Sequence, residues 1–142
     1  MSLMLLRATL AALLKMMVPA IAAPDHDATA AAEDACLNRP ENASTAGQTE
    51  CEAAAAKAYD RRMNQAYASL LRRLPAPAAE KLRSAQRAWI AFRDSEQAAR
   101  NALFATRSGT LYVPMQAASA VRLVRDRALQ LEAYRRIVAI GD

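Results

Sequence analysis

The sequence has little of what strands, tight turns and metal or catalytic sites require. Its 142 residues include three glycines, one histidine and two cysteines, and aromatic residues make up 5% of the chain. Alanine, leucine, arginine and glutamate are abundant, and no strand-like alternation of useful length occurs. This composition favours helix, and the length suits one domain. We therefore expect a single all-α domain.

The rarity of histidine and glycine also limits the chemistry. His26, the only histidine, lies near the N-terminus, so a nucleophilic triad lacks its base and a metal site lacks ligands. No glycine-rich loop could hold a phosphate. Asp94 and Glu96 are two residues apart and point to different sides of a helix, unlike the converging carboxylates of a glycosidase. We predict a protein that is not an enzyme and binds no metal or cofactor.

The first 22 residues, MSLMLLRATLAALLKMMVPAIA, have the features of a secretory signal peptide. Arg7 precedes an apolar stretch, and the final Ala-Ile-Ala fits a small-x-small cleavage site. Lys15 interrupts the stretch, and its pieces are too short to span a bilayer, which needs about 20 apolar residues. An ordinary amphipathic helix is the alternative. We predict cleavage after Ala22 and a periplasmic or secreted protein without stable membrane insertion.

The excess of positive charge is small. The formal charge is +5, and removal of Arg7 and Lys15 with the first 22 residues leaves 17 basic and 14 acidic residues, a charge of +3. The arginines are spread over three segments without interleaved aromatic residues, which argues against binding of nucleic acid. Solvated helix faces are the simpler interpretation. Binding to a membrane surface rests on this charge balance alone.

The two cysteines agree with export. Cys36 and Cys51 flank a polar segment that contains Pro40 and Gly47, and in an oxidising compartment such a pair is most simply a disulfide. Closing a loop of this size stabilises the fold by about 3 kcal/mol in the chain-entropy model. Residues 23–35, which precede the loop, are rich in alanine, aspartate and threonine, and we expect them to be a flexible leader.

Three amphipathic segments follow. The first begins near Thr49, which forms a predicted capping box with Glu52, and ends before Pro75. The second starts around Pro77 and ends at Ser108-Gly109, and the third starts near Pro114. Short connections favour antiparallel neighbours. We expect a three-helix antiparallel bundle over residues 36–138, with the disulfide-closed N-terminal loop packed over one end.

The apolar stripes of these segments recur at helical spacing. The first consists of Tyr59, Met63, Ala66, Tyr67, Leu70 and Leu74. The second consists of Leu82, Ala85, Trp89, Phe92, Ala99 and Leu103, with Glu96 as its one polar member. The third consists of Ala117, Val121, Val124, Ala128, Leu131 and Val138.

A set of polar and aromatic residues accompanies these stripes. Asp60, Asn64 and Tyr67 lie on one side of the first helix, and Gln86, Trp89 and Arg93 lie on one side of the second. The order Asp60-x-x-Met63-Asn64-x-x-Tyr67, Gln86-x-x-Trp89-x-x-Phe92-Arg93-Asp94 and then Arg127 resembles the lysozyme inhibitor LprI-like family. These are small exported helical domains with disulfides, and the resemblance covers roughly residues 36–137.

The resemblance also explains Gln97. The family pattern has a cysteine at this position and a second cysteine eight residues before the late arginine, where Ser119 stands. The loss of both is expected if these two cysteines bond to each other, because keeping one would leave a free exported thiol. The pair Cys36 and Cys51 is retained.

The resemblance implies binding to lysozyme or another peptidoglycan hydrolase. Animal-type lysozymes are cationic, so a chain of charge +3 would be repelled at long range. An acidic patch of Asp25, Asp27, Glu33 and Asp34 could overcome that repulsion. The alternative function is a periplasmic helical module with a structural or scaffolding role and no lysozyme target.

The motif residues have a structural interpretation. We expect Trp89 to anchor the core between three helices. We expect partly buried hydrogen bonds between helices, which fix their register, from Gln86, Asn64, Arg93, Asp94 and Arg127. An exposed partner-binding patch is the alternative for these residues. Leu111 and Tyr112, in a predicted loop, are better candidates for an exposed contact.

Overall fold

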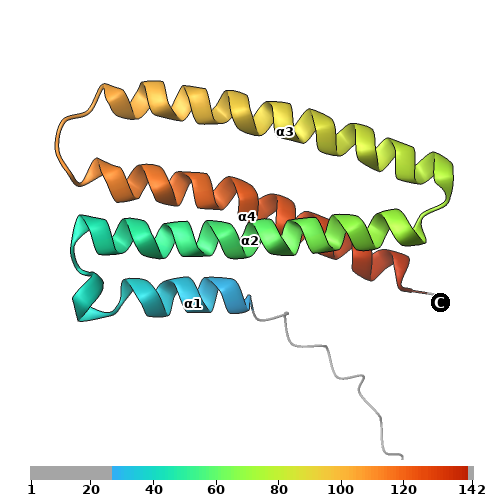
Figure 1. Ribbon diagram of the computed structural model, residues 1–142, viewed down its shortest axis with the longest axis horizontal. Helices are drawn as coiled ribbons and strands as arrows, with labels where there is room; N and C mark the ends of the chain where they lie inside the picture. The colour runs from blue at the N-terminus through green and yellow to red at the C-terminus, as the bar shows by residue number, and fades with distance from the viewer. Residues whose placement is uncertain (1–26, 141–142) are drawn as a thin grey trace, which may run out of the picture.

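The computed structural model describes residues 27–140, and its regular elements are all helical (Figure 1). They are α1 (Ala28–Leu37), the short 3₁₀ helix η1 (Pro40–Asn42), α2 (Thr45–Arg73), α3 (Ala76–Ala105) and α4 (Tyr112–Val138). The predicted all-α class is confirmed. The predicted number of helices is wrong, because the described residues form four α-helices rather than three. The predicted signal peptide lies outside the described residues.

Helix α1 occupies most of the segment that we expected to be a flexible leader, and that expectation is wrong from residue 27 onward. Asp27 is the N-cap of α1, and its side chain accepts hydrogen bonds from the backbone N–H groups of Thr29 and Ala30 at 3.2 and 3.3 Å. The helix has only 10 residues, and helices this short are marginal in isolation. Its stability therefore depends on packing against α2.

Helix α2 begins four residues before the predicted start. Ser44 is the N-cap, and its Oγ accepts a hydrogen bond from the N–H of Gly47 at 3.0 Å. The predicted capping box is wrong, because Thr49 and Glu52 lie inside the helix. The Thr49 hydroxyl donates to the carbonyl of Thr45 at 2.7 Å, and Glu52 is 6% exposed.

The hydrophobic core lies mainly between α2 and α4, which pack along much of their lengths. These two helices run in the same direction, and α1 and α3 run opposite to them (Figure 1). The antiparallel arrangement of successive helices therefore agrees with the prediction. The core cluster consists of Ala55, Tyr59, Met63, Ala66, Leu70, Val121, Ala128 and Leu131.

Helix α3 packs much less closely on the other helices than α2 and α4 pack on each other. Its buried residues are Ala79 and Gln86, and in Figure 1 it stands apart from α2. Phe92 and Leu103, from the predicted apolar stripe, are 51% and 57% exposed. The predicted stripe is therefore wrong in part. Leu82, Trp89 and Glu96 are partly buried, whereas Ala85 and Ala99 are exposed, like Phe92 and Leu103.

The connection between α3 and α4 forms one end of the molecule (Figure 1). Helix α3 ends at Ala105, before the predicted end at Ser108-Gly109, and Gly109 lies in the loop with a φ of 110°. This left-handed conformation favours glycine. Helix α4 begins at Tyr112, two residues before Pro114. None of the helices within residues 27–140 is long and apolar enough to cross a bilayer.

Candidate functional site

The disulfide corner joins α1 to the start of α2. Cys36 and Cys51 are bonded with Cα atoms 5.7 Å apart, which confirms the predicted disulfide. Asn42 of η1 donates from Nδ2 to the Cys36 carbonyl at 2.8 Å. A Cβ atom on Gly47 would lie 2.7 Å from the Asn42 Cα. Only glycine therefore lets η1 approach α2 closely enough to close this corner.

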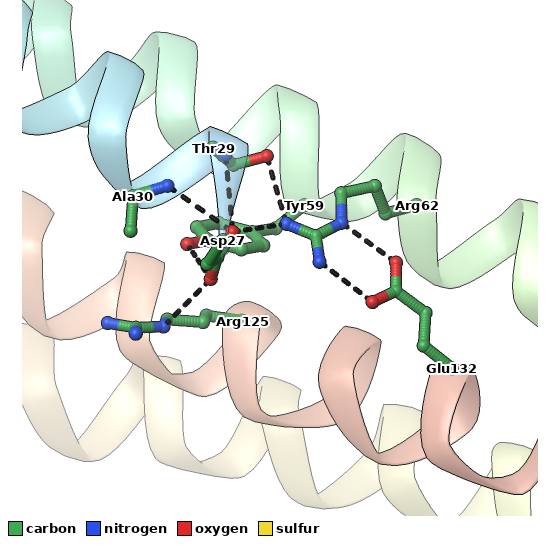
Figure 2. A network of polar contacts seen from close by, with 7 residues as sticks. All are labelled: Asp27, Thr29, Ala30, Tyr59, Arg62, Arg125 and Glu132. Carbon is green, nitrogen blue, oxygen red and sulfur yellow. Dashed lines mark hydrogen bonds and ion pairs between the residues drawn. The ribbon is translucent and has the colours of Figure 1, made fainter. Parts of the chain in front are cut away.

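A polar network ties the beginning of α1 to α2 and α4 (Figure 2). Arg62 of α2 donates from Nε and Nη2 to the two carboxylate oxygens of Glu132 at 2.8 and 2.7 Å, and from Nη1 to Asp27 at 2.5 Å. The Tyr59 hydroxyl donates to Asp27 at 2.7 Å, and Arg125 Nε lies 3.5 Å from the same carboxylate. One arginine thus bridges three helical segments.

The network perturbs the acidity of its members. Burial alone would raise the pKa of Asp27, but hydrogen bonds from Tyr59 and Arg62 lower it overall. The hydrogen bonds from Arg62 hold the pKa of Glu132 below its ordinary value, and burial next to Asp27 raises the pKa of Tyr59. The charge of Asp27 is therefore neutralised by arginines, so this residue does not contribute to the free acidic patch that we considered. Asp25 lies outside the described residues.

The structure brings together two of the predicted motif residues across α3 and α4. Arg127 donates from Nε and Nη2 to Oε1 of Gln86 at 3.0 and 2.8 Å, and from Nη1 to Gln130 at 2.6 Å. Gln86 and Arg127 are 6% and 8% exposed. The Arg127 guanidinium lies 5.9 Å from the ring centroid of Trp89, and burial lowers the pKa of Arg127.

Trp89 itself is partly buried and packs against the core cluster from its edge. The fully buried aromatic residue is Tyr59, which is 0% exposed. Because α3 stands away from α2, the tryptophan contacts the core without forming its centre. The expectation of a tryptophan anchor between three helices was therefore too strong.

The other motif residues do not form the expected bonds between helices. Asn64 donates to Asp60 at 3.0 Å within α2, and Arg93 donates to Asp94 at 3.0 and 2.8 Å within α3. The hydrogen bonds of both pairs are exposed and stay within one helix, and the Arg93 guanidinium lies 5.6 Å from the ring centroid of Trp89. Tyr67 is partly buried against the core cluster.

Gln97 and Ser119 lie at the two ends of a chain of hydrogen bonds between α3 and α4. Gln97 donates to the Asn101 side chain at 3.3 Å, and Gln116 of α4 donates to the same oxygen at 2.8 Å. The Ser119 hydroxyl donates to the Gln116 carbonyl at 2.7 Å. Polar contacts therefore connect the region where the family pattern has two cysteines.

A pair of carboxyl groups lies beside the disulfide corner. Burial and a hydrogen bond with Glu33 raise the pKa of Glu52 to about 7, while the charge of Arg122 opposes the shift. Glu52 also lines a cavity of about 290 Å³ together with Leu37, Gln48, Leu111, Pro114, Met115 and Ala118. The sequence offers no signal for this site, because the spacing of Thr49 and Glu52 predicts a capping box instead.

Exposed apolar side chains gather near the end of the molecule that carries the α3–α4 loop. We define the tip surface as Leu111, Val113 and Met115, which are 65%, 52% and 49% exposed. Leu111 agrees with its predicted exposure, whereas Tyr112 is only partly exposed. Near the opposite end, a second apolar cavity of about 250 Å³ is lined by Leu70, Leu74, Leu82, Tyr134, Ile137 and Val138.

These features define a small, disulfide-linked helical domain with an exposed apolar surface at one end. The profile of the family described as Lysozyme inhibitor LprI matches residues 36–131. This chain belongs to that family, which confirms the resemblance seen in the sequence motif.

A crystal structure of an uncharacterized protein from Burkholderia thailandensis has a similar fold, with a TM-score of 0.75 and 33% sequence identity. The similarity covers 80% of this chain and 56% of that chain, so this chain spans little more than half the length of that protein. No curated protein matches this chain.

Proposed function

We propose that this protein is an exported, non-catalytic inhibitor of a lysozyme-type peptidoglycan hydrolase. Membership of the LprI family over residues 36–131 is the observation that carries the proposal. The disulfide between Cys36 and Cys51 supports export, because disulfides persist in oxidising compartments. The signal-like segment at residues 1–22 would direct that export.

We further propose that the hydrolase binds at the tip surface. Large exposed apolar side chains gathered at one end of a domain favour a protein interaction site there, and loops on a rigid scaffold often carry binding residues. Leu111 and Val113 would supply apolar contacts, with the Cys36–Cys51 corner holding the neighbouring backbone in place. If this protein covers the substrate cleft of the hydrolase, it inhibits the enzyme by excluding the polysaccharide.

The first test is a titration of purified residues 23–142 against several types of lysozyme, with hydrolysis of bacterial cell walls as the readout. We expect stoichiometric inhibition of at least one type. No inhibition of any type at micromolar protein would refute the proposal and favour the structural or scaffolding role.

The binding surface is tested by two matched substitutions. Leu111→Asp changes the tip surface, and Ile137→Asp changes a residue of similar exposure on the other side of the fold, 65% against 63%. We expect the first to weaken inhibition by about tenfold or more, as for a residue at the centre of an interface. Equal effects of the two substitutions would exclude the tip surface.

A further inference from the structure

The cavity beside the disulfide corner combines apolar walls with one buried carboxyl group. Its rim includes Leu111 and Met115, which also belong to the tip surface, and its wall includes Leu37 and Pro114. Glu52 lines the same cavity and is 6% exposed. The cavity therefore adjoins the surface proposed to bind the hydrolase.

Glu52 has another acid as its hydrogen-bonding neighbour. Its buried Oε2 atom has no N–H donor within residues 27–140, and the hydrogen bond between Glu52 and Glu33 requires a proton on one of the two carboxyl groups. A buried carboxyl oxygen without a donor is costly, and most buried polar groups have a partner. The neighbouring Glu33 is itself an acid, so it offers no cation. Arg122 acts on Glu52 only through its charge.

We propose that this cavity receives a lysine or arginine side chain of the hydrolase, with the cationic head paired to Glu52. This inference rests on the proposed function. A long cationic side chain has an apolar stem and a charged head, which match the apolar side chains and the Glu52 carboxyl group that line this cavity. The site thus gives a cationic hydrolase a local acidic contact despite the chain's net positive charge.

The proposal makes binding depend on pH. The groups that act on Glu52 are Glu33 of α1, Arg122 of α4 and the partner's cation. Burial and Glu33 raise the pKa of Glu52 to about 7, so pairing with a cation requires loss of the proton from Glu52. We expect affinity for the hydrolase to increase as the pH rises from about 6 to about 8.

The first test compares Glu52→Gln with Asp60→Asn in the mature chain, by calorimetric titration into an inhibited lysozyme. Glutamine preserves the size of the side chain but cannot form the ion pair, whereas Asp60→Asn removes a charge from an exposed position on the same helix. Loss of one partner of a buried charge pair weakens binding by about 30-fold or more, and we expect this only for Glu52→Gln, together with loss of the pH dependence.

If Glu52→Gln binds as tightly as the unmodified chain, the cavity proposal is overturned while the inhibitor function stands. If the unmodified chain binds no lysozyme, the proposed function fails, and the cavity proposal loses its partner. Self-association that disappears in Glu52→Gln, seen by sedimentation, would instead assign the cavity to a second copy and overturn the hydrolase as occupant.

A second measurement examines the cavity without any hydrolase. Butylammonium and butylguanidinium are titrated into the mature protein, and the amide signals of Leu111, Met115 and Glu52 are followed by NMR, with 1-butanol as the neutral control. We expect saturable shifts with both cations that are absent with butanol and in Glu52→Gln. No saturable shift at tens of millimolar cation would overturn the site.

Discussion

Arg127 of α4 donates two hydrogen bonds to a single oxygen of Gln86 of α3, at 3.0 and 2.8 Å, and both side chains are buried. Gln86 is one of two buried residues on α3. The pair therefore holds α3 to the core, because this helix has few other buried residues. Two residues of the sequence motif thus form a buried contact between α3 and α4.

Gln86→Leu should destabilise the fold by about 2 kcal/mol, because it leaves buried guanidinium donors without their acceptor. The free energy of unfolding in urea, followed by circular dichroism, measures the loss. Gln97→Leu, an exposed glutamine on the same helix, should change stability by less than about 0.5 kcal/mol. The double variant Gln86→Leu with Arg127→Met should recover much of the loss. Equal stability of the two glutamine variants would contradict the assigned role.

Asp27→Asn should loosen α1, because it removes the ion pair with Arg62 but keeps an acceptor for the helix cap. The loss is expected to be about 1 to 2 kcal/mol, typical of a charge-assisted hydrogen bond. Hydrogen exchange of the α1 amides measures it, and Asp34→Asn, exposed on the same helix, is the control. Unchanged exchange in Asp27→Asn would show that the network does not hold α1.

Asp27 should also make the stability of the fold sensitive to acid. The folded pKa of Asp27 lies below the ordinary value of 3.8, so the carboxylate stabilises the fold above the unfolded pKa. This contribution is lost as the pH falls through the folded value. Thermal unfolding between about pH 5 and pH 2 should therefore show a decrease in stability that is smaller in Asp27→Asn.

Glu52 should give the stability of the fold the opposite pH dependence, at higher pH. Burial and Glu33 raise its pKa from 4.5 to about 7 in the folded state. Its stabilising contribution is fully present below pH 4.5 and is lost as the pH rises through 7. Stability should therefore fall by roughly 3 kcal/mol across this range. The stability of Glu52→Gln should depend less on pH over this range, and at pH 8 this variant should be at least as stable as the unmodified chain. Parallel pH profiles of the two proteins would contradict the raised pKa.

Gln97 and Ser119 predict the position of a second disulfide. Gln97 lies eight residues before the end of α3, and Ser119 lies seven residues after the start of α4. The variant Gln97→Cys with Ser119→Cys should form a disulfide on oxidation and gain about 3 kcal/mol in the chain-entropy model. Thiol titration measures formation of the disulfide, and urea unfolding with and without a reducing agent measures the gain in stability. Persistent free thiols under oxidising conditions would show that the two positions do not face each other.

The helical class and the disulfide could be predicted because their determinants are local. Low glycine and aromatic content, apolar residues at helical spacing and proline at the turns specify helices from the residues themselves. Two cysteines allow only one pairing. The order of motif residues from Asp60 to Arg127 identified the family, since that pattern is also a property of the chain alone.

The start of α2 and the whole of α1 could not be predicted from the same signals. Thr49 and Glu52 match a capping box, yet Ser44 caps the helix because η1 packs against Gly47. Residues 28–35 resemble a leader in composition, yet they are helical because Asp27 binds Tyr59 and Arg62, which are far from it in the sequence. Both outcomes depend on contacts between distant segments.

The sequence by itself determined the all-α class, the disulfide and the family, because periodicity, cysteine count and motif order can be read from the chain without its tertiary contacts. Only the tertiary structure decided which polar residues became partners. It paired Gln86 with Arg127 and left Asn64 and Arg93 with hydrogen-bond partners on their own helices, because α3 packs loosely. It also placed Glu52 in a cavity beside the tip surface, because the disulfide holds the end of α1 at the start of α2 and the packing of α4 on α2 brings the start of α4 to the same end.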